Sequence, residues 1–311
     1  MSWIDLHIDT AAKILDLGAD PLLPCPDIHV DIPRMERAGV RAAVWASCVE
    51  DKATGDAATT RAMRMMLAAR DLAFRSGGRV RLVLSPGDLE GTGVGMILGL
   101  EGADALQGRL GLLTAFHAAG LRVLTLTWNH SNAFACGCRV EPDQDGGLSE
   151  AGERLIARAQ ALGVVLDLAH ASPRTLGDAL ARLRRPFLVS HTGCAALRSH
   201  RRNLSDGQLE LVARAGGVIG ICAFPGFTGP RLDDMAAHVA HAVSIAGVDS
   251  VAIGTDFDGI TSTPEGLGGI EALPRLSDVL RTSGLNADVI EKVTWRNAHR
   301  VLREGLDGKE A

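Results

Sequence analysis

Ionisable side chains stand at the ends of almost every short apolar run in this sequence. His7 and Asp9 end the first run, and later runs end at Glu101, at Trp128 and Asn129, at His170, at His191, and at Asp256 and Asp258. His7 and Asp9 are two residues apart, so on a strand their side chains point to the same face. Histidine and carboxylate ligands together suit zinc or a similar divalent cation.

The number of candidate ligands favours two metal ions over one. Five ligands suggest two ions that share a carboxylate, and the candidates are His7, Asp9, Glu101, His170 and His191. A carboxylated lysine is excluded as the bridge, because none of the four lysines ends a predicted strand. Glu101 is therefore the natural bridging candidate.

Each of these residues also has an ordinary structural interpretation. A lone histidine after a strand, such as His170, is commonly a hydrogen-bonding residue. Asp9 or Asp256 could cap a helix, and Glu101 could simply begin the next helix. This interpretation is weaker for the whole set, because it requires six independent buried polar residues at the ends of separate strands.

The elements that must position these residues alternate between strands and helices. Short β-branched runs predict nine strands, at 4–9, 40–49, 80–84, 95–101, 122–128, 163–170, 186–191, 217–223 and 250–256. Amphipathic segments predict helices at 55–76, 104–119, 149–162, 173–183, 205–215, 233–247, 274–283 and 286–303. The pattern favours an α/β fold, a single (β/α)8 TIM barrel over residues 1–311, with the metal site at the C-terminal ends of the strands. A doubly wound sheet is the alternative.

One of the nine strand candidates is surplus to an eight-stranded barrel. Only about ten residues separate the candidate at 80–84 from the next one at 95–101, and a parallel crossover needs a dozen or more. We therefore place 80–84 outside the barrel, or as an edge piece that precedes it.

Composition excludes several functional classes. The 311 residues carry 32 Lys and Arg against 37 Asp and Glu, a net charge of −5, and 46% are hydrophobic. Such a chain is too hydrophobic for disorder and poorly suited to nucleic acid or to anionic membranes. The N-terminus lacks the basic and apolar regions of a signal peptide, and no apolar stretch is long enough for a membrane span. We expect a cytoplasmic protein without nucleic-acid or membrane partners.

Two other sets of potential metal ligands receive structural interpretations. Cys136 and Cys138 are separated by one residue, which is not the usual zinc spacing, and we expect all six cysteines to be free thiols. His238 and His241 share a face of the predicted helix at 233–247. Since no acidic partner stands at a matching spacing, we expect a solvated helix face there.

Six segments together give a specific resemblance. They are DLHIDT (5–10), LGLEGADAL (98–106), LRVLTLTWNHSNAFA (121–135), GLSEAGERLIARAQALGVVLDLAHAS (147–172), VSHTGCAALRSHRRNLSD (189–206) and IGTDFDG (253–259). In this order, over nearly the whole chain, they resemble the membrane dipeptidase (renal dipeptidase) family, the M19 metallopeptidases of the amidohydrolase type. Any one segment alone would be a weak signal.

The resemblance implies a role for each candidate residue. His7, Asp9 and Glu101 would bind one Zn2+, and the bridging Glu101 would bind the second together with His170 and His191. Mn2+ or Co2+ suits the same ligands. Arg202 would hold the C-terminal carboxylate of a dipeptide, and Asp256 would handle the proton beside the metal-bound water. Arg201 and Asp258 would be structural, and a homodimer is compatible with the family.

One position departs from the family. Its better-known members carry a histidine directly after the LTLT strand, where this chain has Trp128, followed by Asn129. His130 could supply a donor from the loop, although an exposed loop histidine is the alternative. The expected activity is that of a binuclear zinc dipeptidase. A hydrolase for a pathway-specific or cyclic amide and a non-catalytic binding protein on the same barrel remain alternatives.

Overall fold

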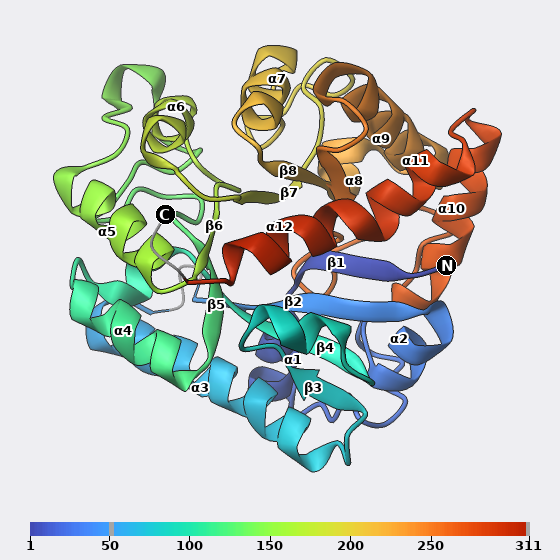
Figure 1. Ribbon diagram of the computed structural model, residues 1–311, viewed down its shortest axis with the longest axis horizontal. Helices are drawn as coiled ribbons and strands as arrows, with labels where there is room; N and C mark the ends of the chain where they lie inside the picture. Colours follow the sequence, from blue (N-terminus) through green and yellow to red (C-terminus); the bar gives the residue numbers. More distant parts are fainter. Residues whose placement is uncertain (50–52, 309–311) are drawn as a thin grey trace.

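Nine parallel strands form the centre of the molecule. The computed structural model describes residues 1–49 and 53–308, and Figure 1 shows the strands surrounded by helices. The strands are β1 (Trp3–Ile8), β2 (Val40–Cys48), β3 (Val80–Leu82), β4 (Val94–Glu101), β5 (Leu121–Thr125), β6 (Val165–Asp167), β7 (Leu188–Thr192), β8 (Val218–Ile221) and β9 (Val251–Ile253). Their order is β2-β1-β9-β8-β7-β6-β5-β4-β3, and pairing of β2 with β4 closes eight of them into a barrel. The predicted (β/α)8 architecture is confirmed.

Strand β3 lies outside the closed barrel, as predicted from the surplus candidate. β2 pairs with β4 along residues 95–101, so one edge of β4 is fully used. The other edge is divided, because β3 pairs with residues 94–96 and β5 pairs with residues 98–101. The reason given from loop length is wrong, however. β3 and β4 are parallel neighbours, and a short connection that contains the 3-10 turn Pro86–Glu90 suffices to join them.

Helices follow most strands at the predicted places. They are α1 (Thr10–Leu17), α2 (Ile32–Ala38), α3 (Gly55–Arg75), α4 (Leu110–Ala119), α5 (Glu150–Ala161), α6 (Pro173–Arg182), α7 (Asp206–Arg214), α8 (Pro225–Thr228), α9 (Leu232–Ala246), α10 (Leu273–Thr282), α11 (Ala287–Glu291) and α12 (Asn297–Gly305). Sequence patterning missed α1, α2 and α8, which are too short to show a clear 3.6-residue period. The predicted helix at 104–119 starts later, because Gly108 in the left-handed region separates a 3-10 turn from α4.

Helix starts follow the expected side-chain chemistry. Ser149 accepts a hydrogen bond from the backbone N–H of Gly152 at the start of α5. Ser205 and Gln208 form a reciprocal capping box at the start of α7. Such caps satisfy backbone donors that have no partner inside the helix, and they fix where each helix leaves its loop.

One end of the barrel is closed by a helix. α12 crosses in front of the barrel in Figure 1 and packs against β1, β8 and β9. Its residues Ala298, Val301 and Leu302 share a buried apolar cluster with residues from the interior of the barrel, among them Ile4 and Val218. Among the described residues, no helix is both long and apolar enough to cross a membrane. The C-terminal ends of the strands lie at the other end of the barrel.

Candidate active site

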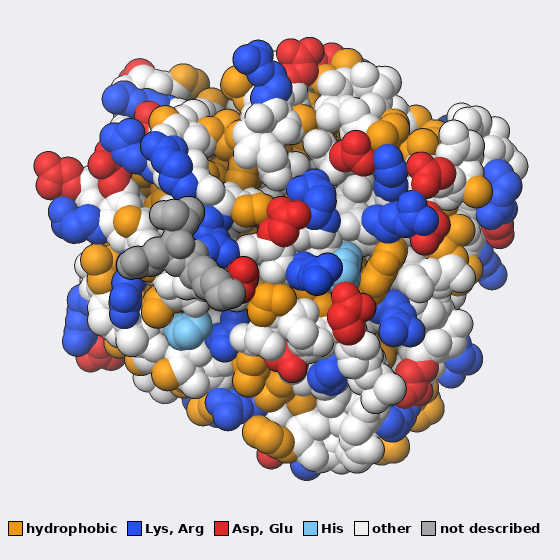
Figure 2. Space-filling view, in the orientation of Figure 1, with side chains coloured by type: hydrophobic (Ala, Val, Ile, Leu, Met, Phe, Trp, Pro, Cys, Tyr) orange, Lys and Arg blue, Asp and Glu red, His pale blue; other side chains and the backbone are white. Residues whose placement is uncertain are grey.

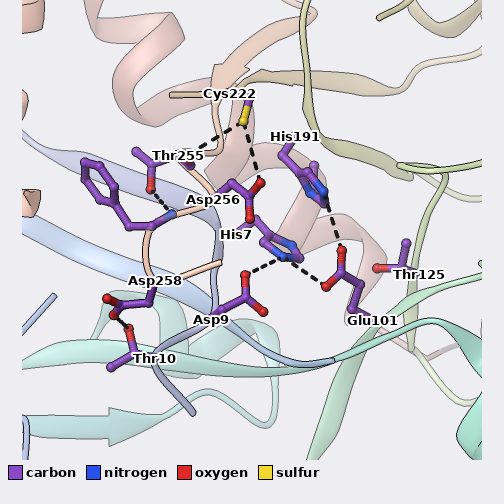
Figure 3. Close-up of polar contacts among 12 residues, drawn as sticks. His7, Asp9, Thr10, Glu101, Thr125, His191, Cys222, Thr255, Asp256 and Asp258 are labelled. Atoms are coloured by element: carbon purple, nitrogen blue, oxygen red, sulfur yellow. Dashed lines mark hydrogen bonds and ion pairs between the residues drawn. The ribbon is translucent and has the colours of Figure 1, made fainter. Parts of the chain in front are cut away.

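The ends of five strands bring the predicted ligands together. His7 lies in β1, Glu101 is the last residue of β4 and His191 lies in β7. Asp9, His170 and Asp256 follow the ends of β1, β6 and β9. Because parallel strands all end on the same side of the barrel, their side chains converge there (Figure 3).

The carboxylate of Glu101 stands at the centre of the cluster. Its Oε1 atom lies 2.9 Å from Nε2 of His170 and 3.5 Å from Nε2 of His191. Its Oε2 atom faces the other way and lies 3.6 Å from Nε2 of His7. The Nε2 atom of His7 is also 3.3 Å from Oδ2 of Asp9. The two oxygens of Glu101 therefore face two different sets of ligands, as a carboxylate that bridges two ions would.

The donor set fits a pair of divalent cations. Two groups of ligand atoms each lie within 4.8 Å of one another, namely His7, Glu101 and His191, and His7, Asp9 and Asp256. Among the described residues, the Nε2 atom of His7 is buried without a hydrogen-bond partner, which is costly for a polar atom unless another group binds it. Imidazole nitrogens and carboxylate oxygens in a buried cluster are typical ligands of zinc.

The ordinary interpretations of the acidic residues do not match the geometry. Asp9 occupies the N-cap position of α1, but its side chain makes no capping hydrogen bond there and faces His7 instead. Glu101 ends β4, and the next helical turn begins only at Ala103. Asp256 precedes a turn, and no helix begins within the next few residues.

Hydrogen bonds to the Nδ1 atoms, on the side of the ring away from Glu101, orient two of the histidines. Nδ1 of His170 lies 2.9 Å from Oδ1 of Asn129, and Nδ1 of His191 lies 2.9 Å from Oγ of Ser190. An amide oxygen can only accept, so His170 carries its proton on Nδ1 and presents the lone pair of Nε2 to the centre. Ser190 Oγ–H donates to Asp167 at 2.7 Å, which leaves its oxygen to accept from His191. Asn129 therefore positions a ligand, a role that the sequence analysis did not assign to it.

Two buried aspartates that sequence reasoning missed brace the strands that carry the ligands. Asp167 accepts from the hydroxyl groups of Thr125 and Ser190 and from the backbone N–H of Ser190. Asp5 accepts from the hydroxyl and the backbone N–H of Thr255. Each aspartate thus holds the residue directly before a site residue, Ser190 before His191 and Thr255 before Asp256. The available signal was a single charged residue inside an otherwise apolar run.

Two residues of the candidate active site have a strained backbone conformation. His170 and Asp256 both have φ of 63°, in the left-handed region that non-glycine residues seldom adopt. Their backbones are anchored, since the His170 carbonyl accepts from the N–H of Cys138 and the Asp256 N–H donates to the His7 carbonyl. Such strained residues persist only where the surrounding structure holds them, and they are common at functional sites.

Burial and neighbouring charge set the protonation of the cluster. Burial, reinforced by the adjacent Asp9 carboxylate, raises the pKa of Asp256 well above its ordinary value. Burial alone would raise the pKa of Glu101 too, but His7 and His170 hold it well below its usual range. Burial, with the positive charge of Arg202, lowers the pKa of His170 to about 4. A neutral imidazole is the form that binds metal.

A cavity of about 450 Å³ opens above the cluster. Trp128, Asn129 and Arg202 line it together with Asp9, Glu101, His170, His191 and Asp256. Arg202 is only 6% exposed, and its Nη2 donates to the His191 carbonyl at 3.0 Å. Its Nε is buried without a hydrogen-bond partner among the described residues. The Arg202 guanidinium thus borders the cavity beside the candidate ligands.

The remaining candidates lie outside the centre. His130 is exposed and absent from the lining of the cavity, with its ring 6.2 Å from that of Trp128. Asp258 accepts from Thr10 Oγ1 at 2.6 Å and from the backbone N–H of His29 at 2.7 Å, which fits a loop-supporting role. All six cysteines lie in the described part of the chain, and none of them forms a disulfide bond there. One of them, Cys222, donates to Asp256.

Comparison with known proteins gives consistent results. The family model for the membrane dipeptidases, peptidase family M19, matches residues 1–309. An uncharacterized protein in the pqqA 5' region of Klebsiella pneumoniae is 36% identical over 250 residues, which cover 75% of this chain and 92% of that protein. Dipeptidase aclJ of Aspergillus oryzae is 32% identical over 215 residues, 67% of this chain and 51% of that longer protein. A metallopeptidase from Rhodobacter sphaeroides, solved with a phosphinate mimic of the dipeptide L-Ala-D-Ala, has a TM-score of 0.91 at 25% identity, with 98% and 99% of the two chains covered.

Proposed function

The chain belongs to the membrane dipeptidase family, peptidase family M19, and on that premise we propose that it is a binuclear zinc dipeptidase. The observation that carries the proposal is the placement of Glu101, whose two oxygens face His7 on one side and His170 with His191 on the other. His7, Asp9 and Glu101 would hold one ion, and Glu101, His170 and His191 the other. When bound, such a pair lowers the pKa of a shared water to about 7 and polarises the scissile carbonyl.

Arg202 sets the length of the substrate in this proposal. A guanidinium binds a planar carboxylate with two parallel hydrogen bonds, and Arg202 lines the cavity beside the candidate ligands. Beside the candidate metal ligands, Arg202 would hold the C-terminal carboxylate of a substrate that ends one residue past the scissile bond. A cavity of about 450 Å³ suits a small ligand. These features favour a dipeptidase over an endopeptidase.

Asp256 is placed to handle the proton. It lies beside Asp9 and His7 within the ligand cluster, and burial raises the pKa of its carboxyl well above the ordinary value. In its ionised form, a carboxylate with a raised pKa is a stronger base, so it can accept a proton from the attacking water and then pass it to the leaving amine. Trp128 and Asn129 would then form the cavity wall, and Asn129 would also keep His170 in the metal-binding tautomer.

A second candidate function rests on the same cavity. Trp128 stands where better-known relatives have a histidine, and losing one donor to the developing oxyanion can cost about 10²–10³ in rate. Trp128 therefore favours, as the alternative, an amidohydrolase that acts on a pathway-specific amide. A binding protein without catalysis is the third reading, but the complete set of buried ligands opposes it.

The test is amino-acid release from a panel of L-L, L-D and D-L dipeptides by the zinc-loaded protein. We expect release that a chelator abolishes and that Glu101→Gln abolishes together with binding of both ions, measured by elemental analysis. Glu150→Gln, at a side chain that is 94% exposed on α5, is the matched control and should leave both readouts unchanged. A folded protein with two metal ions that releases nothing would sink the dipeptidase proposal and favour the amide alternative.

A further inference from the structure

The cavity wall beyond the candidate ligands carries a surplus of positive charge. Arg139, Arg201 and Arg202 all line it. Among the described residues that line the cavity, the carboxylates are Asp9, Glu101 and Asp256, and the proposed function assigns these to metal binding and proton transfer. With these three assigned, no further carboxylate among the described lining residues compensates the charges of the three arginines. Such a wall attracts an anionic ligand.

Arg139 and Arg201 are held together at the wall. Nη1 of Arg201 donates to the backbone carbonyl of Arg139 at 3.0 Å. The backbone N–H of Arg139 donates to the carbonyl of Asn129, and its guanidinium lies 5.9 Å from the centre of the Trp128 ring. Trp128 therefore positions a cation next to the cavity, a role that a histidine at this place would perform less well.

Internal ion pairs compensate these arginines only weakly. Glu141 Oε1 lies 3.8 Å from Nη2 of Arg201, and both side chains are at least half exposed, so this pair is worth little. Among the described residues, the Arg139 guanidinium lies over the Trp128 ring. A ligand carboxylate would meet both guanidinium groups without displacing a strong partner.

All three arginines border the same stretch of the cavity wall, since a hydrogen bond joins Arg201 to Arg139 and Arg201 directly precedes Arg202 in the chain. Burial raises the pKa of the Cys138 thiol, and the charges of Arg202, Arg139 and Arg201 each oppose that rise. Burial and the charges of Arg202 and Arg201 also lower the pKa of His200, which lines the same wall. A second anionic group of the ligand would therefore lie close to the carboxylate that Arg202 holds.

We propose that the second residue of the substrate is acidic, with its α-carboxylate at Arg202 and its side-chain carboxylate between Arg139 and Arg201. This inference rests on the proposed dipeptidase function and narrows it to dipeptides that end in aspartate or glutamate. The two carboxylates of such a residue are a few bonds apart, which matches three guanidinium groups around one part of the wall.

The test compares acidic dipeptides with their neutral isosteres. Zinc-loaded protein is given Ala-Glu and Ala-Gln, and Ala-Asp and Ala-Asn, each with the L or the D form of the second residue. We expect kcat/KM for the acidic member of a pair to be higher on the order of tenfold, which corresponds to about 1.4 kcal/mol for the extra charge contact. The ratio of kcat/KM between the acidic and the neutral dipeptide should fall as salt is added.

Two substitutions locate the preference. Arg139→Gln and Arg201→Gln should each raise KM more for the acidic dipeptides than for the neutral isosteres. The double variant should abolish the ratio of kcat/KM between acidic and neutral dipeptides. Arg154→Gln is the control, because Arg154 is 62% exposed on α5 and makes a comparable weak ion pair away from the cavity. Thermal unfolding of each variant confirms that it is folded.

The possible outcomes separate the two proposals. Equal turnover of acidic and neutral dipeptides, or a ratio that survives the double substitution, overturns the acidic preference and leaves the dipeptidase function standing. No turnover of any dipeptide by a folded, metal-loaded protein overturns both. A preference for acidic dipeptides that depends on Arg139 and Arg201 supports both.

Discussion

At the scale of single residues, a hydrogen-bonded chain determines which nitrogen of His191 faces the metal centre. Asp167 is fully buried and accepts from Ser190 Oγ–H, and the same oxygen of Ser190 accepts from Nδ1–H of His191. A proton fixed on Nδ1 leaves the Nε2 lone pair directed at Glu101 and at the ion it would bridge. Removing such a supporting group usually costs 10- to 100-fold in metal affinity or activity.

Ser190→Ala should therefore weaken one of the two metal sites. The change deletes the partner of His191 Nδ1 and leaves the ligand itself in place, so we expect the affinity for one ion to fall by about ten- to hundredfold while the other ion is retained. Competition with a chromophoric chelator measures both sites. Ser277→Ala is the matched control, because Ser277 is also buried but bonds Pro274 on α10. Two unchanged affinities in Ser190→Ala would contradict the positioning role.

The candidate metal ligands could be predicted from the sequence, but the buried aspartates that hold the neighbouring strands in place could not. His7, Glu101 and His191 are visible because a titratable residue at the end of an apolar strand has few structural reasons to be there. Asp5 and Asp167 were missed because their partners, Thr255 and Ser190, come from neighbouring strands. That pairing depends on the barrel register, which a single sequence does not reveal.

At the scale of elements, the strands were predicted better than the short helices. A run of β-branched residues that ends in a turn is a local signal, and all nine predicted strands exist. α9 shows where the local signal fails. His238 was expected on a solvated face, but it is 2% exposed, and its Nδ1 accepts from the backbone N–H of Cys194, which follows β7. Tertiary packing of α9 against that loop buries it.

The burial of His238 predicts a loss of stability in acid. Burial lowers its pKa from 6.5 to about 4, so between these values the unfolded chain binds a proton that the folded chain excludes. Stability from this group is complete above pH 6.5 and is lost as the pH falls toward 4. We expect about 1–2 kcal/mol, after allowing for partial screening.

Denaturant unfolding of wild type and of His238→Asn, each at pH 7 and pH 4.5, measures this contribution. Asparagine offers Oδ1 to the Cys194 N–H without titrating, so the pH dependence should be shallower in the variant. Metal release in acid affects both proteins and cancels in the difference between them. Equal slopes would show that His238 does not contribute.

Close approach of strands inside the barrel predicts a second effect at this scale. A Cβ atom built on Gly254 would lie 1.8 Å from the carbonyl oxygen of Ser190, the residue before His191. Gly254→Ala must therefore displace β7 or β9. We expect the free energy of unfolding to fall by about 3 kcal/mol or more, and metal binding to weaken.

Gly177→Ala on α6 is the control. Its Cβ meets nothing within 4 Å, and a gain of about 0.5–1 kcal/mol is expected. Calorimetric unfolding of both variants and of the wild type measures these changes in stability.

At the scale of the whole molecule, the two ends of the barrel have different tasks. α12 covers the N-terminal end with apolar side chains, and on that face acidic and basic groups are interspersed (Figure 2). The other end brings the buried Asp9 and Glu101 together with the half-buried Asp256. Carboxylates at close range and away from water repel one another and are costly to ionise. This electrostatic cost falls on the end of the barrel that carries the candidate site.

Metal binding should relieve that cost and stabilise the whole fold. Burial raises the pKa values of Asp9 and Asp256, so without metal these groups release their protons at a higher pH than ordinary carboxyl groups, and divalent ions compete with those protons. Free metal at a hundred times its Kd should add about 2.7 kcal/mol, equivalent to roughly 5 °C in Tm for a chain of this size. A chelator should reverse the gain, and the gain should shrink as the pH is lowered. Differential scanning fluorimetry against zinc concentration measures it, with Glu101→Gln as the variant that loses the gain. An unchanged Tm across the zinc titration at neutral pH would mean that the cluster binds no metal in the folded protein.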